Sequence, residues 1–195
     1  MDHQDRRHGF TLLELVLVAA ILVILAGIVL PSISGLREDS SLTATTETFH
    51  AIRNAVAGTE GRPGYLADMG RLPSTLRDLF IQPAGATPFD RFTARGWRGP
   101  YLMDATGTYR VDVAKGFLPA YGAEGDPALA DAWGRPVILQ VPTTASDTNQ
   151  RDQFTRIVSA GPDGVVQTPP ASLYPTTDHR GDDVLLFLMR PDIAP

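Results

Sequence analysis

A single carboxylate interrupts a long apolar segment near the amino terminus. Residues 10–30 contain only one charged side chain, that of Glu14. A carboxylate within an apolar span costs a few kcal/mol to insert into lipid, so we expect Glu14 to have a partner and a function. The chemistry open to it is pairing with a cationic partner, because a low dielectric strengthens such a pair. A carboxylate that only reaches toward the lipid headgroups is the alternative interpretation.

A second group of acidic residues lies in a loop near the carboxyl terminus. The loop begins with Gly161-Pro-Asp-Gly and ends with Gly181-Asp-Asp. Hard cations such as Ca²⁺ bind carboxylate and carbonyl oxygens, and a loop of this composition can wrap around one. The candidate calcium ligands are four aspartates: Asp163, Asp178, Asp182 and Asp183. The alternative is a solvated acidic turn, in which these aspartates shape a turn and protect a strand edge.

The other reactive residue types form no catalytic pattern. The four histidines show no ligand spacing, cysteine is absent, and no nucleophile elbow, zinc-binding helix motif or phosphate-binding glycine loop occurs. The 17 Lys and Arg against 22 Asp and Glu give a net charge of −5 without any basic run, which argues against nucleic-acid binding. We therefore expect a protein that is not an enzyme and has no cofactor other than the candidate calcium ion.

The apolar segment around Glu14 has the length of a membrane span. As a helix rising about 1.5 Å per residue, residues 10–30 would reach roughly 31 Å, the thickness of a hydrocarbon core. Arg6 and Arg7 precede this segment, and the next basic residue is Arg37. The positive-inside rule thus predicts a cytoplasmic amino terminus and a translocated carboxyl-terminal domain. A cleaved secretory signal is the alternative, but the apolar run is longer than usual and its end is a poor cleavage site.

The helical pattern continues beyond Pro31 in amphipathic form and stops at Gly58. The positions that recur at intervals of three and four, and that we expect to face the core, are Leu42, Thr45, Phe49, Ile52 and Val56. Residues 10–57 would then form one helix of roughly 70 Å, half of which must bury its surface in lipid or in other subunits. A short helix with Ser74 as its N-cap is expected next.

Three apolar runs of strand length follow, at residues 136–141, 154–159 and 183–189. A small antiparallel sheet packed on the amphipathic half-helix is the economical arrangement, which makes the predicted fold class α+β.

The amino-terminal sequence resembles a known processing signal. Arg6-Arg-His-Gly-Phe-Thr-Leu-Leu-Glu-Leu, with an apolar stretch ending at Pro31, resembles the type III signal of type IV pilins and type II secretion pseudopilins. The resemblance implies that prepilin peptidase cleaves between Gly9 and Phe10, and that Phe10 is then N-methylated. It implies an assembly role for Phe10, Glu14 and Pro31, in which the Glu14 carboxylate of one subunit neutralises the Phe10 ammonium of its neighbour.

Three further blocks resemble the G-type major pseudopilin. They are Gly70-Arg-Leu-Pro, Gly96-Trp-Arg-Gly-Pro-Tyr-Leu and Asp131-Ala-Trp-Gly-Arg-Pro. The resemblance implies a pilin-like fold and a calcium ion in the loop that contains the four aspartates. The chain departs from the family in two places: residues 103–130 are longer than expected, and residues 165–177 replace a glycine-rich stretch.

The sequence thus predicts a pseudopilin with three parts: a cytoplasmic leader at 1–9, a transmembrane and filament-core helix at 10–30, and a periplasmic pilin-like domain at 31–195. Within that domain we expect an amphipathic half-helix at 31–60, a variable region at 61–135 and the sheet at 136–190. The implied location is the inner membrane before assembly and a periplasmic pseudopilus afterwards. The implied partners are other copies and other pseudopilins, prepilin peptidase, membrane lipid, the assembly platform and the secretion ATPase. A type IV pilus or competence pilin, and an anchored binding domain that does not polymerise, are the alternatives.

Overall fold

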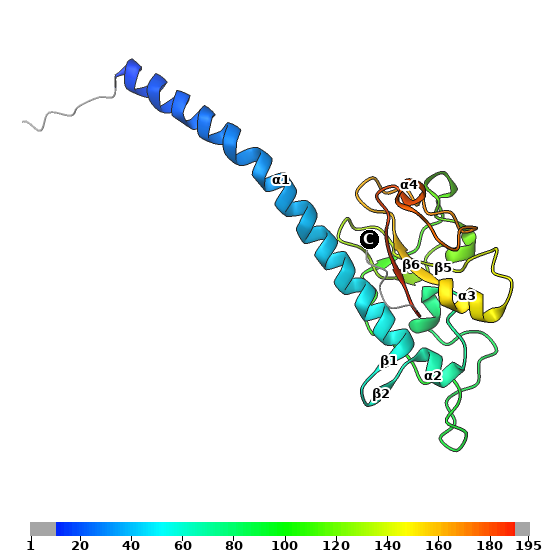
Figure 1. Cartoon of the computed structure of the whole chain (residues 1–195). Helices are drawn as coiled ribbons and strands as arrows, with labels where there is room; N and C mark the ends of the chain where they lie inside the picture. The colour runs from blue at the N-terminus through cyan, green and yellow to red at the C-terminus, as the bar shows by residue number, and fades with distance from the viewer. Residues whose placement is uncertain (1–10, 190–195) are drawn as a thin grey trace, which may run out of the picture. The chain divides into compact units, whose positions relative to one another are not determined.

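The computed structural model describes residues 11–189, except for the side chains of residues 26–36. The chain divides into two compact units, one ending at Ser40 and one beginning at Ser41. The helix α1, Leu12–Ala57, contributes to both (Figure 1). Gly58 ends α1 with a φ of 88°, a left-handed conformation that favours glycine. The long helix and its end at Gly58 confirm the sequence prediction over the described residues.

The second unit is built from short elements around one principal sheet. The helical segments after α1 are α2 Tyr65–Met69, η1 Leu76–Leu79, η2 Val113–Lys115, η3 Pro119–Tyr121, α3 Thr148–Phe154 and α4 Thr177–Arg180, where η denotes a 3₁₀-helix. The strands are β1 Gly58–Thr59, β2 Arg62–Pro63, β3 Gly107–Thr108, β4 Pro127–Ala128, β5 Ile138–Gln140, β6 Arg156–Ser159 and β7 Val184–Phe187. The α+β class is therefore confirmed.

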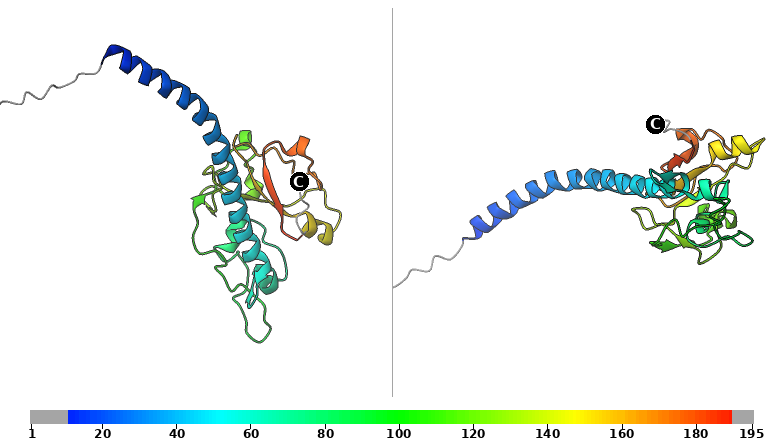
Figure 2. Two further views of the ribbon diagram at one scale, coloured as in Figure 1. Left: turned by 60° about the vertical axis from the view of Figure 1, so that its left-hand side comes forward. Right: turned by 90° about the horizontal axis from the view of Figure 1, so that it is seen from below.

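The principal sheet is antiparallel with the order β5-β6-β7. Figures 1 and 2 show β7, in orange-red, beside β6, in yellow. All three strands fall within the predicted apolar runs. The two-residue pairs β1-β2 and β3-β4 were not predicted, because two residues are too few to show an alternating pattern.

Strand alternation gives this sheet two buried faces. Leu139, Ile157 and Leu186 share one rung of the ladder and pack in a cluster with Phe49 and Ile52 of α1. The neighbouring rung faces the other way and packs against the segment that carries β3, η2, η3 and β4; its members are Ile138, Val158 and Leu185, and they meet Tyr109, Phe117 and Tyr121. The long segment at 103–130 therefore covers the face of the sheet that lies away from α1.

Two predictions about core and capping residues were wrong. Leu42 is 38% exposed, whereas Thr45, Phe49, Ile52 and Val56 are buried as predicted. The second compact unit begins only at Ser41, so its core covers the helix from Thr45 onward. Ser74 caps no helix with its side chain; η1 has Thr75 at its N-cap position, and the backbone N–H of Ser74 donates to Oδ2 of Asp78.

Candidate functional site

Glu14 lies in the first turn of α1, where its side chain is exposed. The hydroxyl of Thr11 accepts a 3.3 Å hydrogen bond from the backbone N–H of Glu14. Thr11 and Glu14 have the spacing of a capping box, and an acidic residue there is favoured by the helix dipole. This local role accounts for the start of the helix at Leu12. The cleavage and methylation site predicted at Gly9 and Phe10 lies outside the described residues, as does the side chain of Pro31.

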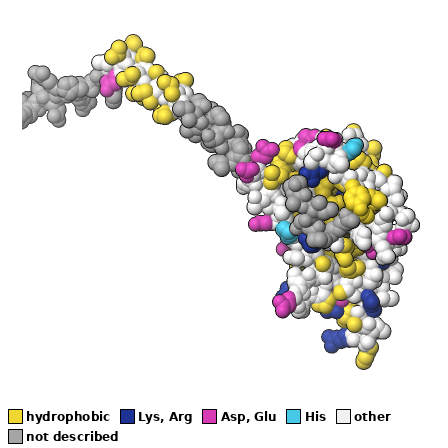
Figure 3. Space-filling model, in the orientation of Figure 1, with side chains coloured by type: hydrophobic (Ala, Val, Ile, Leu, Met, Phe, Trp, Pro, Cys, Tyr) yellow, Lys and Arg dark blue, Asp and Glu magenta, His cyan; other side chains and the backbone are white. Residues whose placement is uncertain are grey.

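The first unit presents an exposed apolar surface along the described part of α1. The large hydrophobic side chains of residues 12–25 are between 49% and 81% exposed, and they form the yellow stretch of helix in Figure 3. Apolar area of this extent on a single helix marks a surface made for contact with lipid or another protein. Over the residues that the structure describes, no helix combines the length and apolarity of a membrane span. The predicted span at 10–30 includes Phe10 and side chains outside that description, so it stays a prediction.

The Asp131-Ala-Trp-Gly-Arg turn joins the helix to the sheet. Oδ1 of Asp131 accepts 2.9 Å hydrogen bonds from the N–H groups of Trp133 and Arg135. Its other oxygen, Oδ2, accepts from the Ser159 hydroxyl in β6. The hydroxyl of Thr45 in α1 accepts from the N–H of Ala132 at 3.2 Å. This turn, singled out in the sequence, is thus a structural anchor.

The loop at 160–183 connects β6 to β7 and contains the four predicted calcium ligands. Asp163 accepts at both oxygens, from the N–H of Val165 at 2.7 Å and from the Gln167 amide at 2.6 Å. Asp182 accepts at Oδ2 from the N–H of Asp163 at 3.0 Å. Asp178 lies in α4 and is exposed.

Asp183 is the buried member of the predicted set. Its Oδ2 accepts three hydrogen bonds, from the Gln167 N–H, the Thr168 N–H and the Thr168 hydroxyl. Its Oδ1 is buried without a hydrogen-bond partner. Burial raises the pKa of Asp183 to about 6, against the opposing effect of the Thr168 and Gln167 donors.

Within the described part of the chain, no three acidic or histidine side chains lie together as metal ligands would. The structure therefore does not bring the four aspartates into one cluster, and calcium binding stays a prediction.

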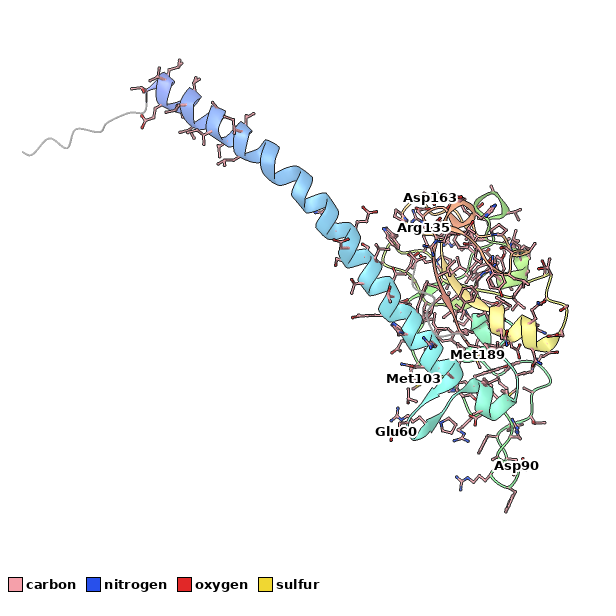
Figure 4. The ribbon with its side chains drawn as sticks, viewed as in Figure 1. Glu60, Asp90, Met103, Arg135, Asp163 and Met189 are labelled. Carbon is pink, nitrogen blue, oxygen red and sulfur yellow. The ribbon has the colours of Figure 1, made fainter. Side chains whose placement is uncertain are left out.

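Two arginines that the sequence reasoning missed contact the same loop. Arg135 donates from Nη1 to the carbonyl of Gly161 at 2.6 Å, and Figure 4 shows Arg135 next to Asp163. Arg156 in β6 is completely buried and donates to loop carbonyls at Pro169 and Ser172. The available signal was the arginine next to Ile157 and Val158 in a predicted strand, because a charged side chain is rarely buried.

Comparisons with known proteins agree with the observations at the amino terminus. Residues 4–30 match the family model described as the prokaryotic N-terminal methylation motif. The chain is thus of the prepilin class, with that motif immediately before and within the start of α1.

The chain is also similar to a specific member of that class. Over 142 residues it is 30% identical to the type II secretion system core protein G of Aeromonas hydrophila, an alignment that covers 66% of this chain and 92% of that protein. The chain belongs to this family, the G-type pseudopilins, whose members are structural subunits. No solved structure matches the chain.

Proposed function

We propose that this chain is a non-enzymatic structural subunit of a type II secretion pseudopilus. The observation that carries the proposal is the exposed apolar surface of α1 at residues 12–25, within the segment that matches the methylation motif. Such a surface must be shielded from water. We infer that membrane lipid contacts it before assembly and that neighbouring subunits contact it in the filament. The compact second unit would then lie on the outside of the filament.

Processing would set up the assembly contact. Cleavage between Gly9 and Phe10 by prepilin peptidase leaves an ammonium group on Phe10, which is then methylated. Glu14 follows four positions later in the sequence, and its side chain is exposed, so that it can reach a neighbouring chain. A carboxylate of one subunit paired with the ammonium of the next would set the axial register in a low-dielectric filament core. Pro31 would mark the end of the apolar half of α1.

The remaining partners follow from this assignment. The subunit would be inserted in the inner membrane with its amino terminus in the cytoplasm and its second unit in the periplasm. The assembly platform and secretion ATPase would then drive its extraction into the pseudopilus with other pseudopilins. Growth of that filament would push secreted proteins outward.

The test of the register role is Glu14→Ala, with Glu47→Ala as the matched control. Glu47 is an exposed acid of the same helix, but lies in the amphipathic part. We expect the Glu14 variant to be cleaved and retained in the membrane without filaments, while the control assembles. Filament formation by both variants would show that Glu14 does not set the register.

A separate measurement tests processing. Mass spectrometry of the membrane form should find a methylated amino terminus at Phe10. An intact leader would instead favour an anchored domain that never polymerises.

A further inference from the structure

The loop at 160–183 has to be held on the sheet without disulfides, because the chain contains no cysteine. In the G-type pseudopilins a calcium ion serves a loop at this place, as the resemblance above implied. A calcium ion takes six to eight oxygen ligands and needs carboxylates that are free to turn toward it. Whether this chain supplies such ligands can be judged from the partners that its aspartates already have.

The aspartates at the two ends of the loop are joined to each other through Gln167. Its side-chain amide donates to Asp163 at 2.6 Å, and its Oε1 accepts from the N–H of Asp182 at 3.3 Å. Its backbone N–H donates to Asp183 at 2.8 Å. Gln167 belongs to residues 165–177, the stretch that replaces the family's glycine-rich sequence. The replacement has therefore brought in a side-chain donor that occupies Asp163, one of the carboxylates from which a calcium site would be built.

A positive charge also stands at the start of the loop. The Arg135 guanidinium donates to the carbonyl of Gly161, an oxygen of the kind that calcium would use. A guanidinium this close to the Gly161 carbonyl would repel a divalent cation bound there, and it already donates a hydrogen bond to that oxygen. The donors around Asp163 and Gly161 thus do not fit a calcium ion.

The strongest attachment of the loop is the side chain of Arg156. Strand alternation places Arg156 directly opposite Gln140, on the face of the sheet away from α1. Its three nitrogens donate to three neutral oxygens: Nε to Gln140 Oε1 at 2.6 Å, Nη1 to Ser172 O at 2.7 Å and Nη2 to Pro169 O at 2.8 Å. Both carbonyls belong to the middle of the loop. A buried cation with oxygen partners on both the loop and the sheet can connect the two, as a bound metal ion would.

The same network continues to the end of the loop. The Gln140 amide donates to the Tyr121 hydroxyl at 3.0 Å and to the Thr168 carbonyl at 2.9 Å. Thr168 in turn donates from its N–H and hydroxyl to Asp183. Arg156 and Asp183, a buried cation and a buried carboxylate, are thereby connected through Gln140 and Thr168. The cation remains charged at neutral pH, because burial lowers the pKa of Arg156 only to about 10.

We propose that the Arg156 guanidinium, in place of a calcium ion, holds the loop at 160–183 on the sheet. The proposal rests on hydrogen bonds within the second unit and is independent of filament assembly. It makes the fold of this subunit independent of calcium, although the chain belongs to a family for which a metal ion is implied.

The first test needs no variant. Thermal unfolding of the detergent-solubilised full chain is measured with the chelator EGTA and with added Ca²⁺. A ligand at 100 times its Kd would raise the Tm of a chain of this size by about 5–10 °C. We expect a shift of less than about 1 °C. A rise of several degrees with Ca²⁺ would overturn the proposal.

The second test asks whether Arg156 orders the loop. Trypsin cleavage after Arg180, within the loop, is followed by mass spectrometry in wild type, Arg156→Met and the control Arg151→Met. Arg151 is exposed in α3, so its loss should leave the loop unchanged. We expect cleavage after Arg180 to be at least tenfold faster in the Arg156 variant, and Ca²⁺ not to slow it. Equal rates in the two variants, or rescue by Ca²⁺, would contradict the proposal.

A milder variant covers the case in which Arg156→Met does not fold. Gln140→Leu removes the acceptor for Nε and the link to Thr168, but leaves both carbonyl contacts of Arg156 in place. Cleavage after Arg180 should then lie between the wild-type and fully released rates. Two results together would show that a metal ion holds the loop instead: cleavage of the Gln140 variant at the wild-type rate, and faster cleavage of the wild-type protein when EGTA is added.

Discussion

The Ser159 hydroxyl donates a 2.6 Å hydrogen bond to Oδ2 of Asp131, although 28 positions separate the two residues. Both side chains are buried, and the bond ties β6 to the turn that precedes β5. Since Asp131 also accepts the N–H groups of Trp133 and Arg135, one carboxylate organises the turn and attaches it to the sheet.

Asp131→Ala should therefore destabilise the domain by about 3 kcal/mol, because three donors lose their acceptor in a buried site. Ser159→Ala removes one of these donors and also the acceptor of the Gly161 N–H, and it should cost about 2 kcal/mol. Urea unfolding of the solubilised chain measures both. Asp104→Ala is the control: this aspartate is exposed, and its loss should change stability by less than about 0.5 kcal/mol.

Thr45→Val tests the attachment of α1 to the same turn. The valine keeps the shape of the threonine but leaves the N–H of Ala132 without its acceptor, at a cost of about 1–2 kcal/mol. Thr46→Val is the matched control, because Thr46 is exposed and its hydroxyl donates only to Leu42 within the helix. Equal losses of unfolding free energy in the two variants would mean that the contact between helix and turn contributes nothing.

Gly64→Ala should lower the stability of the second unit strongly, although it adds only one methyl group. A Cβ there would collide with the backbone at Gly58 and Val56, where α1 ends beside the β1-β2 hairpin. We expect a loss of about 3 kcal/mol in chemical unfolding. Gly61→Ala should cost only about 1 kcal/mol, because its φ of 76° disfavours alanine while its surroundings are open. The reverse order would contradict the packing at this corner.

Alkaline pH should unfold the protein through its tyrosines. Burial raises the pKa of Tyr101 to about 12, and it raises the pKa values of Tyr65, Tyr109 and Tyr121 as well. A raised pKa in the folded state means that the unfolded chain loses these protons first, so stability is retained below about pH 10 and falls as pH rises toward 12.

Absorbance at 295 nm, recorded with circular dichroism, checks this prediction. Phenolate formation should be delayed beyond pH 10 and should coincide with loss of structure. Full ionisation near pH 10 with the fold intact would contradict the burial of these side chains. Tyr101→Phe removes the hydroxyl that donates to Asp68 and accepts from the Arg98 N–H, and it should reduce the loss of stability between pH 10 and pH 12.

Features that repeat along the chain were predictable, and single long-range contacts were not. The intervals of Thr45, Phe49, Ile52 and Val56 predicted the buried face of α1, because each helical turn repeats the same orientation. Leu42 has the same spacing, but it precedes the part of α1 that packs on the core, and its side chain is exposed. Periodicity states which residues share a face, while the length of the covered face depends on where the rest of the chain packs.

The sequence by itself determined the long helix and the three strands of the principal sheet, because each depends on local spacing, and the resemblance of its amino terminus to a prepilin signal indicated the class of protein. The tertiary structure alone decided that residues 103–130 cover the second face of the sheet, and that Arg156 reaches the carbonyls of Pro169 and Ser172. An arginine in a strand is usually solvated, so its burial could not be read from its neighbours in sequence. It became a structural cation only because the chain folded a ring of neutral oxygens around it.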